Sequence, residues 1–436
     1  MSNPNLIAVM SNNLSGEIYV PGDKSISHRA IILSLLSEGN TIIKNILMAD
    51  DIKNTIEVSK ALGSDIRTIE NDIEVVGLGI DGLKKPNNDL DFGNSGTSIR
   101  LFMGILCNQN FSTILTGDNS LIKRPMERVA KPLRLMGANI FMNNETAPIT
   151  ISAPRNKLRG ITYHLDIPSA QIKSAILLSS LFINEKTLLK VDTQTRNHTE
   201  NMFRLFSYPI EIGNNSIEIF PGNLKTPKSI DVPGDFSSAS FFILAALLAK
   251  NSKLIIRDVG LNPTRTGLIS ILKLMGADIL INITKNDEFE PVGDIEVKSS
   301  SLKGIEVPYN LISLSIDELP LVFLAAAYAN GKTSIRNAKE LRYKESDRIK
   351  SMVSMLRQFS IEVLEYHDGV TIQGGKITGG EVNSFGDHRI AMTALVASCI
   401  SKEPIVVKNC ENINTSFPSF VALMNSVGMN ITSNKS

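Results

Sequence analysis

Residues that build disulfide frameworks and metal clusters are scarce in this sequence. Its 436 residues include three cysteines (Cys107, Cys399 and Cys410) and five scattered histidines. Because the cysteines have no paired spacing and no HExxH motif occurs, we expect neither a disulfide framework nor a metal site. Cysteine usage of this kind fits a reducing, cytoplasmic setting.

The sequence also lacks a net charge and a long apolar run. Its 45 Lys and Arg residues against 44 Asp and Glu residues leave a net charge of +1, which predicts no general attraction to nucleic acid or to a membrane surface. Apolar runs such as FFILAALLA (241–249) are about half of the roughly 20 residues that a spanning helix needs. The N-terminal residues lack a basic region followed by a continuous apolar one, so we expect no signal peptide. Any recognition of anions must therefore be local.

The chain is long enough for more than one hydrophobic core. With 436 residues and 42% hydrophobic content, it can form two or three cores of roughly 150 residues each. One pattern is repeated along it: a start rich in Gly, Ser or Asp, a short apolar helix, a polar turn and a β-branched strand. The six helical segments are DKSISHRAIILSLL (23–36), NSGTSIRLFMGIL (94–106), SAQIKSAILLSSL (169–181), GDFSSASFFILAALL (234–248), SIDELPLVFLAAAYA (315–329) and GDHRIAMTALVASCI (386–400).

The spacing of these segments predicts the architecture. Their starts lie 66 to 82 residues apart, which suits a βαβ-type unit of about four elements. A second, amphipathic helix usually follows each strand and ends in a turn with Gly, the usual left-handed helix stop. Six such units divide most simply into two α/β domains of three units each. The boundary is expected near 226–236, where two prolines and a glycine interrupt the pattern.

Positive charge at the helix starts is the unusual feature of the repeat. A helix N-terminus already carries about half a positive charge, so acidic side chains are expected there. Four starts instead contain cations: Lys24 with Arg29, Arg100, Lys173, and His388 with Arg389. One such residue alone would be read as a solvated or capping side chain. Four together, beside free backbone N–H groups, favour a site for anions.

The other two starts are acidic, and two further segments are basic. Asp317 lies in SIDE (315–318), where it is either a functional carboxylate or part of a capping box. Arg124 precedes Pro125, a residue that suits the first turn of a helix, so we expect Arg124 at another helix start. In NAKELRYKESDRIKSM (337–352) we expect a helix with Lys344 and Arg348 on one face. Many local cations in a nearly neutral chain fit small, multiply anionic substrates.

A nucleotide-binding loop is not expected. The segment GLGIDG (77–82) matches GxGxxG, but the residues after it contain Pro86 and show no apolar helix period. We therefore expect a hairpin or loop at this point. The segment PGDKS (21–25) lacks the GxxxxGK[ST] pattern of a Walker loop.

Seven motifs in a fixed order resemble one enzyme family. They are PGDKSISHRA, GNSGTSIR, RPM, PSAQIKSA, RNHTE, RYKESDRI and FGDHRIAM, spread over essentially the whole chain. On these motifs the sequence resembles the 3-phosphoshikimate 1-carboxyvinyltransferases, also called EPSP synthases. The resemblance implies a two-domain inside-out α/β barrel with three βαβαββ repeats in each domain. The N-terminal domain would be 21–234, the C-terminal domain 1–20 plus 235–436, and the active site would lie in the interdomain cleft.

The resemblance also implies the reaction. Family members transfer the enolpyruvyl group of phosphoenolpyruvate to the 5-hydroxyl of shikimate 3-phosphate, a step toward chorismate and the aromatic amino acids, and release phosphate. The path is addition and elimination through a tetrahedral intermediate, without metal or cofactor. We expect these two small molecules as the only partners, with no nucleic acid and no membrane, and a cytoplasmic monomer.

Matching the motifs residue by residue assigns expected roles. Shikimate 3-phosphate would be bound by Lys24, Ser25, Arg29, Ser169, Ala170, Gln171, Arg196, Asp317 and Lys344. Phosphoenolpyruvate would be bound by Lys24, Asn94, Gly96, Arg124, Gln171, Arg348 and Arg389, with His388 as a further candidate. The catalytic residues would be Asp317, which accepts the hydroxyl proton, Glu345, which protonates the methylene carbon, and Lys24.

The sequence departs from the family pattern at three positions. Ala170 stands where many members have a second Ser, so it would contribute only its backbone. Thr415 stands where many members have a Lys, and Leu101 where one branch of the family has a Pro. The resemblance assigns no firm role to His28, for which we expect packing or hydrogen bonding.

Two alternatives are weighed against this assignment. UDP-N-acetylglucosamine enolpyruvyl transferase is similar in fold and donor, but its lid typically has a reactive Cys five residues before an Arg-Pro pair. Here that position is Asn119, and Cys107 lies in an apolar helix. A non-catalytic anion-binding protein of the same fold would need losses at the acid and base positions, yet Asp317, Glu345 and Lys24 are present.

Overall fold

The six apolar segments form helices that are buried on nearly every side. Such helices lack a polar face, so they belong inside a core and not at its surface. This confirms the helices expected from the repeat. They are α1 (Lys24–Leu36), α3 (Gly96–Leu106), α5 (Ala170–Ser180), α7 (Phe236–Leu248), α10 (Leu319–Tyr328) and α12 (His388–Ala397).

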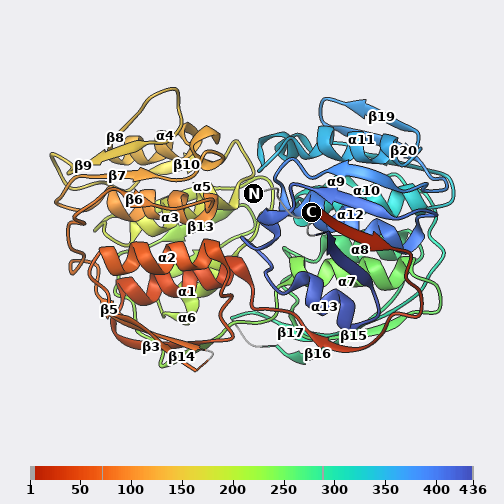
Figure 1. Ribbon diagram of the computed structural model, residues 1–436. Coiled ribbons are helices and arrows are strands. Elements are labelled where there is room, and N and C mark those ends of the chain that lie inside the picture. Colours follow the sequence, from red (N-terminus) through yellow and green to blue (C-terminus); the bar gives the residue numbers. More distant parts are fainter. Residues whose placement is uncertain (1–4, 71, 287–288, 435–436) are drawn as a thin grey trace. The chain divides into compact units, whose positions relative to one another are not determined.

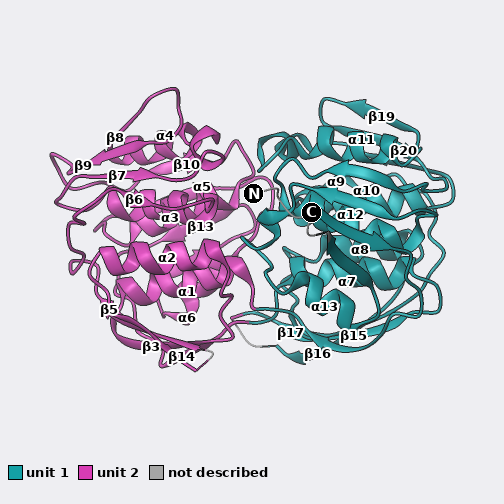
Figure 2. Cartoon of the chain, viewed as in Figure 1, with its two compact units in different colours: residues 1–21, 233–286, 290–436 teal, residues 22–232, 287–289 magenta. Residues whose placement is uncertain are grey.

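These helices belong to two units, each with its own hydrophobic core (Figure 2). The structure is a computed structural model that describes residues 5–70, 72–286 and 289–434. Unit 1 comprises Met1–Pro21, Pro233–Asn286 and Glu290–Ser436, and unit 2 comprises Gly22–Val232 and Asp287–Phe289. The core of unit 2 is built around α1, α3 and α5, and that of unit 1 around α7, α10 and α12.

In unit 2, the described strands form three sheets that surround the helices (Figure 1). Each sheet has a parallel outer pair followed by two antiparallel pairings, the order expected for a βαβαββ repeat. The first sheet is β14 (Ser229–Asp231), β3 (Glu38–Lys44), β5 (Asp72–Leu78) and β4 (Ile66–Ile69). The second is β6 (Leu90–Asp91), β7 (Thr113–Thr116), β9 (Ile149–Ser152) and β8 (Asn139–Met142). The third is β10 (Thr162–His164), β11 (Thr187–Lys190), β13 (Ser216–Ile219) and β12 (Ile210–Ile212).

The described strands of unit 1 repeat this arrangement in three further sheets. The first is β2 (Ser15–Tyr19), β15 (Lys253–Gly260), β17 (Val292–Lys298) and β16 (Asp278–Lys285). The second is β18 (Lys332–Ile335), β20 (Gly369–Gln373) and β19 (Val363–Tyr366), with isolated parallel bridges where the other sheets have an outer strand. The third is β21 (Gly380–Asn383), β22 (Ile405–Lys408), β1 (Asn5–Val9) and β23 (Asn430–Asn434). Helices inside and sheets outside make each unit an inside-out α/β fold.

Three strands complete repeats that lie far away in the sequence. Strand β1 pairs with β22 and β23, and β2 pairs in parallel with β15, so both N-terminal strands belong to unit 1. Strand β14 precedes α7 in the chain but pairs with β3 of unit 2. The chain therefore crosses between the units at 21–22 and again at 232–233.

In four of the six repeats the second helix ends as the glycine pattern predicts. Gly63, Gly137, Gly276 and Gly428 have φ angles of 107°, 112°, 102° and 106°, the left-handed region in which Gly stops a helix. These helices are α2 (Asp50–Ala61), α4 (Glu127–Met136), α8 (Gly267–Leu274) and α13 (Phe420–Ser426). The corresponding helices α6 (His198–Leu205) and α11 (Arg348–Gln358) end without this glycine, and α9 (Tyr309–Ile312) is a single turn.

Two expected helix positions were wrong. Arg124 is extended (φ −79°, ψ 143°) after the 3₁₀ turn η1 (Leu121–Lys123). Helix α4 begins only at Glu127, with Met126 as its N-cap, so Pro125 is not in the first turn and Arg124 lies in the segment before the helix. Lys344 is also extended, after the 3₁₀ turn η3 (Lys339–Tyr343). Asp347 caps the next helix by accepting a hydrogen bond from the backbone N of Lys350, so α11 begins at Arg348 and does not include Lys344.

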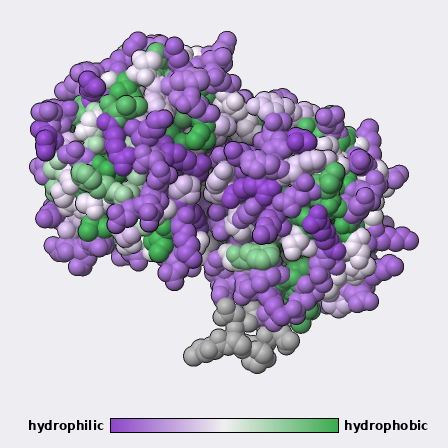
Figure 3. Space-filling model, turned by 90° about the horizontal axis from the view of Figure 1, so that it is seen from above, coloured by the Kyte–Doolittle hydropathy of each residue, from purple (hydrophilic) through white to green (hydrophobic). Residues whose placement is uncertain are grey.

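The segment GLGIDG forms the end of β5 and the turn after it, as expected, and no helix follows it directly. In the part of the chain that the structure describes, no helix is both long and apolar enough to cross a membrane. The face of the molecule shown in Figure 3 is mostly hydrophilic, with apolar residues in small separate groups.

Candidate active site: two sets of charged side chains

In unit 2, the first turn of α1 carries the best-placed cations. The Nζ atom of Lys24 lies 3.0 Å from Oδ2 of Asp51, and both side chains are largely buried. Asp23 caps the helix by accepting a hydrogen bond from the backbone N of Ile26 (2.9 Å), and the first turn holds no acidic residue. The N-terminus of α1 therefore carries the Lys24 ammonium group, which contacts the Asp51 carboxylate.

Arg29 is buried, and three of its hydrogen bonds go to neutral acceptors. Its Nε donates to Oγ1 of Thr199 (2.7 Å), its Nη1 to the carbonyl of Ser25 (2.9 Å) and its Nη2 to Oγ of Ser174 (2.8 Å). These acceptors come from α6, α1 and α5. Neutral acceptors orient a guanidinium group without cancelling its charge, which is the requirement for an anion-binding side chain.

A second pair of arginines lies at the start of α3. Nη2 of Arg124 donates to Oδ1 of Asn94 (2.6 Å), and Nη1 of Arg100 donates to Oε1 of Gln171 (2.9 Å). A Cβ atom on Gly96 would lie 2.8 Å from Nη1 of Arg100 and 2.9 Å from Nη1 of Arg124. Glycine is therefore the residue that lets both guanidinium groups approach this helix start.

The start of α5 contributes polar atoms and a separate ion pair. Ser169 caps the helix, followed by Ala170 and Gln171; Arg196 is partly exposed in the loop between β11 and α6. Lys173 faces inward instead, with Nζ 2.6 Å from Oε1 of the equally buried Glu200. Lys173 is thus part of an internal ion pair, and its place at a helix start did not reveal this.

His28 is buried among hydroxyl groups. Its Nδ1 lies 2.7 Å from Oγ1 of Thr55, in agreement with the expected packing and hydrogen-bonding role. Burial, followed by the charges of Lys24 and Arg29, lowers its pKa well below the usual value, so the ring is neutral. It therefore adds no charge to the anion site.

In unit 1, Asp317 lies at the centre of a cluster of cations. Its Oδ1 is 3.3 Å from Nζ of Lys344 and 3.4 Å from Nη1 of Arg348, and its Oδ2 is 3.8 Å from Nη2 of Arg389. Lys344 and Arg348 thus contact the same carboxylate although they do not share a helix. The capping box considered for SIDE does not form, since the side chain of Ser315 donates to the carbonyl of Leu311 and Glu318 accepts no capping bond.

Arg348 connects three carboxylates while being only 1% exposed. Its Nε donates to Oδ2 of Asp387 (2.8 Å), its Nη2 to Oε2 of Glu345, and its Nη1 to Oδ1 of Asp317 (3.4 Å). Burial opposes the charge, but Asp387, Glu345 and Asp317 outweigh it and raise the pKa of Arg348 above its ordinary value. Arg348 therefore stays charged and sets the positions of two expected catalytic carboxylates.

Arg389 and His388 begin α12. Asp387 caps this helix by accepting a hydrogen bond from the backbone N of Arg389 (2.9 Å). The Arg389 side chain turns back, with Nη1 donating to the carbonyl of Asp317 (2.9 Å) and Nη2 to Oγ of Ser237 (3.1 Å). Thr415, at the position of the family lysine, donates to the carbonyl of Asn412 (2.7 Å) and supplies no cation.

Several polar residues of these clusters were not among the sequence candidates. They are Asp51, Thr199, Ser174, Ser237, Glu318, Arg265 and Asp387. The repeat itself could have pointed to three of them, because Asp387, Ser237 and Glu318 stand in the helix starts GDHR, GDFSS and SIDE. The others contact the site only through the fold.

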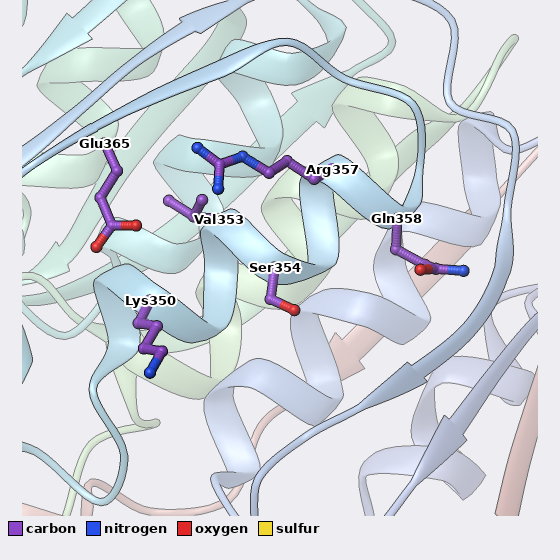
Figure 4. A pocket seen from close by; sticks show the side chains of 6 residues that line it. All are labelled: Lys350, Val353, Ser354, Arg357, Gln358 and Glu365. Atoms are coloured by element: carbon purple, nitrogen blue, oxygen red, sulfur yellow. The ribbon is translucent and has the colours of Figure 1, made fainter.

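One hollow at the surface of unit 1 lies apart from these clusters. It has a volume of about 400 Å³ and is lined by residues of α11 and β19 (Figure 4): Lys350, Val353, Ser354, Arg357, Gln358 and Glu365. Lys350, Ser354, Arg357 and Gln358 are exposed, and none of the lining residues is an expected site residue. Among the described residues, no group of three or more His, Cys, Asp or Glu side chains could hold a metal ion.

Comparison with known proteins decides the family. A sequence model of the EPSP synthase (3-phosphoshikimate 1-carboxyvinyltransferase) family matches residues 9–424. The chain belongs to the EPSP synthase family. It is 46% identical to a 3-phosphoshikimate 1-carboxyvinyltransferase of Coxiella burnetii (strain RSA 493 / Nine Mile phase I) and 45% identical to one of Legionella pneumophila (strain Lens), each over 97% of both chains. The structure of EPSP synthase from Acinetobacter baumannii superposes with a TM-score of 0.88 at 41% identity, covering 99% of this chain and 100% of that one.

Proposed function

We propose that this member of the EPSP synthase family transfers the enolpyruvyl group of phosphoenolpyruvate to the 5-hydroxyl of shikimate 3-phosphate with the two sets of side chains described above. The observation that carries the assignment of roles is the cluster around Asp317. Asp317 contacts Lys344, Arg348 and Arg389, and Glu345 contacts the same Arg348. These contacts support Asp317 as the base and Glu345 as the acid, both beside cations.

Shikimate 3-phosphate is assigned mainly to unit 2. Lys24, Ser25 and Arg29 at the start of α1 hold its phosphate, because a helix N-terminus with oriented cations favours a dianion. Ser169 and Gln171, the backbone of Ala170, and Arg196 complete this side. From unit 1, Asp317 and Lys344 are assigned to the same substrate by the family motifs.

Phosphoenolpyruvate is assigned to a set of cations and polar atoms. Bidentate guanidinium pairing suits both its carboxylate and its phosphate. Gly96 leaves room for the ligand and for the two nearby arginines. The proposed set is Lys24, Asn94, Gly96, Arg124 and Gln171 of unit 2 with Arg348 and Arg389 of unit 1, and His388 as a further contact.

The proton movements follow from the two carboxylates. Asp317 accepts the proton of the 5-hydroxyl as its oxygen attacks C2, and protonated Glu345 donates to the methylene carbon, which gives a ketal phosphate. Glu345 then removes a proton from the new methyl group while the C–O bond to phosphate breaks, and the proton held by Asp317 leaves with the phosphate. Lys24, Arg348 and Arg389 stabilise the negative charge that develops on the phosphate.

We also propose the setting in which the enzyme works. One chain contains every residue type that the reaction needs, which supports an active monomer with domains at 1–20 plus 235–436 and 21–234. Cys107, Cys399 and Cys410 are free and buried, which fits a reducing cytoplasm. Light scattering of the active enzyme tests the first point; a dimer that loses activity on dissociation would contradict it.

The acceptor assay tests the proposed reaction. Phosphate release from phosphoenolpyruvate is measured with shikimate 3-phosphate and, separately, with UDP-N-acetylglucosamine. We expect release with shikimate 3-phosphate and a product whose mass corresponds to its enolpyruvyl ether. Release with UDP-N-acetylglucosamine alone would overturn the assignment, and absence of release with either acceptor would favour a non-catalytic anion-binding protein.

A further inference from the structure

The Ser237 hydroxyl lies between two arginines and a buried carboxylate. It donates to Oε1 of Glu318 and accepts from Nη2 of Arg265 (2.7 Å) and from Nη2 of Arg389 (3.1 Å). Ser237, Glu318 and Arg265 are all less than 5% exposed. None of these three residues has an expected role in the reaction.

Counting donors and acceptors explains the arrangement. A serine hydroxyl has one proton to donate and two lone pairs to accept with. When the proton is directed at Glu318, both lone pairs face the guanidinium groups, so all three capacities of Ser237 are used. The carboxylate of Glu318 thereby sets the direction in which Ser237 receives Arg389.

The charges of the group support this description. Two guanidinium groups that converge on one oxygen repel each other unless an anion lies close by. Oε1 of Glu318 is 3.5 Å from Nη1 of Arg389 and 3.9 Å from Nη2 of Arg265. Asp235 adds a second carboxylate, 3.3 Å from Nη2 of Arg265. The positive charges of Arg265 and Arg389 are therefore balanced by the carboxylates of Glu318 and Asp235.

The group also joins three repeats of unit 1 at their helix starts. Ser237 lies in the first turn of α7, Glu318 immediately precedes α10, and Arg389 lies in the first turn of α12. The bonds of Arg389 to Ser237 and to the carbonyl of Asp317 use one N–H of each terminal nitrogen. These two bonds leave a second N–H on each nitrogen, with Oε1 of Glu318 3.5 Å from Nη1 and Oδ2 of Asp317 3.8 Å from Nη2. A ligand anion would share these N–H groups with the two carboxylates.

We propose that Ser237 and Glu318 are positioning residues that fix the Arg389 guanidinium for phosphoenolpyruvate. The inference rests on the proposed binding role of Arg389. Neither residue touches the substrate; Glu318 orients the Ser237 hydroxyl, and Ser237 holds Nη2 of Arg389. Their loss releases one end of the guanidinium, which weakens recognition of phosphoenolpyruvate while leaving shikimate 3-phosphate binding intact.

The experiment compares steady-state kinetics of Ser237→Ala and Glu318→Gln with Ser240→Ala. Ser240 is the matched control: it is equally buried on α7, but its hydroxyl donates to the carbonyl of Phe236 (2.7 Å), within its own helix. We expect KM for phosphoenolpyruvate to rise about tenfold in Ser237→Ala and in Glu318→Gln, the loss of one hydrogen bond to a charged group. KM for shikimate 3-phosphate should change less than about twofold, and Ser240→Ala should match wild type in both constants.

Two further measurements distinguish a positioning role of Ser237 from a purely structural one, and test the binding role of Arg389 separately. In an Arg389→Gln background, Ser237→Ala should change KM for phosphoenolpyruvate less than about threefold, since the group that it positions is gone. Equal effects of Ser237→Ala in both backgrounds would overturn the proposal, as would a normal KM in the single variants. A normal KM for phosphoenolpyruvate in Arg389→Gln itself would instead refute the binding role of Arg389 in the proposed function.

Discussion

The two units use the same repeated helix start for opposite electrostatic purposes. In unit 2, Arg29, Arg100 and Arg124 are held by hydroxyl, amide and carbonyl oxygens. In unit 1, Arg348 donates to carboxylates, whereas Arg389 donates to a carbonyl and a hydroxyl and has carboxylate oxygens at 3.5 and 3.8 Å. Neutral partners orient a cation and keep its charge for a ligand, whereas carboxylate partners are themselves oriented by the cation. These contacts support the proposed binding of anions by unit 2 and the proposed proton transfers by unit 1.

Lys24 and Lys173 show that position at a helix start is not sufficient for this division. Both lie in unit 2 and both contact a carboxylate, Asp51 and Glu200 respectively. Lys24 is at the edge of its cluster, but Lys173 is enclosed. Whether a cation at a helix start can bind a ligand therefore depends on its protein partner and on its exposure to solvent. The following substitutions test this.

The largest effect is expected at the centre of unit 1. Asp317→Asn keeps the shape of the side chain but removes the base, so we expect kcat to fall at least about 10³-fold. Because the phosphate contacts are assigned to unit 2, shikimate 3-phosphate should still bind, as measured by calorimetry. Near-normal turnover would refute the role of Asp317, and loss of binding would contradict the division between the units.

A loss of stability is expected from the enclosed ion pair of unit 2. Lys173→Met leaves the Glu200 carboxylate buried without its cation, which should lower the free energy of unfolding by about 3 to 5 kcal/mol. Urea unfolding measures it. The double variant Lys173→Met with Glu200→Leu should recover most of the loss, and a single variant as stable as wild type would show that the pair is not enclosed in solution.

Arg29→Gln is the matched comparison on the neighbouring helix. Its guanidinium donates to two hydroxyls and a carbonyl, so we expect a smaller loss of stability but an affinity for shikimate 3-phosphate that is lower by about 100-fold. If Lys173→Met and Arg29→Gln lowered stability and substrate affinity to the same extents, there would be no functional difference between a cation in a buried ion pair and one with neutral acceptors.

A moderate effect is expected at Gly96. An added methyl group would lie 2.8 Å from Nη1 of Arg100 and 2.9 Å from Nη1 of Arg124, so both guanidinium groups must move. We expect Gly96→Ala to raise KM for phosphoenolpyruvate about tenfold, as in the loss of one charged hydrogen bond, with little change for shikimate 3-phosphate. Unchanged constants would mean that neither arginine needs its present position.

The smallest expected effect is a pH dependence of the stability of unit 2, due to His164 near the loops that precede Ser169 and Arg196. His164 is 48% exposed; its Nδ1 and Nε2 each lie 2.8 Å from a carboxylate, of Asp166 and Asp192. Hydrogen bonds to Asp166 and then to Asp192 raise the pKa of His164 above its usual value. A raised pKa in the folded protein stabilises it below the unfolded pKa of about 6.5, and this contribution disappears as the pH rises through the folded pKa.

Melting temperatures of wild type and His164→Asn from about pH 5.5 to 8.5 measure this dependence. At acid pH, wild type should melt at a higher temperature than His164→Asn. At alkaline pH, the two melting temperatures should converge. The reverse order, with the difference growing toward alkaline pH, would show that the two carboxylates do not hold the charged ring.

Much of the architecture was predictable because it depends on local patterns. Apolar residues on all sides of segments such as 236–248 require a buried helix, and Gly63 or Gly137 stops a helix wherever the next residue must turn. The errors were local conflicts. Arg124 was placed at a helix start although α4 begins only at Glu127. Lys344 was placed in a helix that Asp347 starts only afterwards.

The sequence alone determined the repeat, the family resemblance and the types of side chain at each helix start. Only the tertiary structure decided which of those side chains have charged partners. Lys173 and Arg29 look alike in the sequence, but one meets Glu200 and the other meets Thr199 and Ser174. Ser237 lies in the helix start GDFSS, and only the fold brings Glu318 and Arg389, from two other repeats, into contact with it. Such partners are distant in the chain, so no local pattern encodes them, and burial makes their charges strong enough to matter.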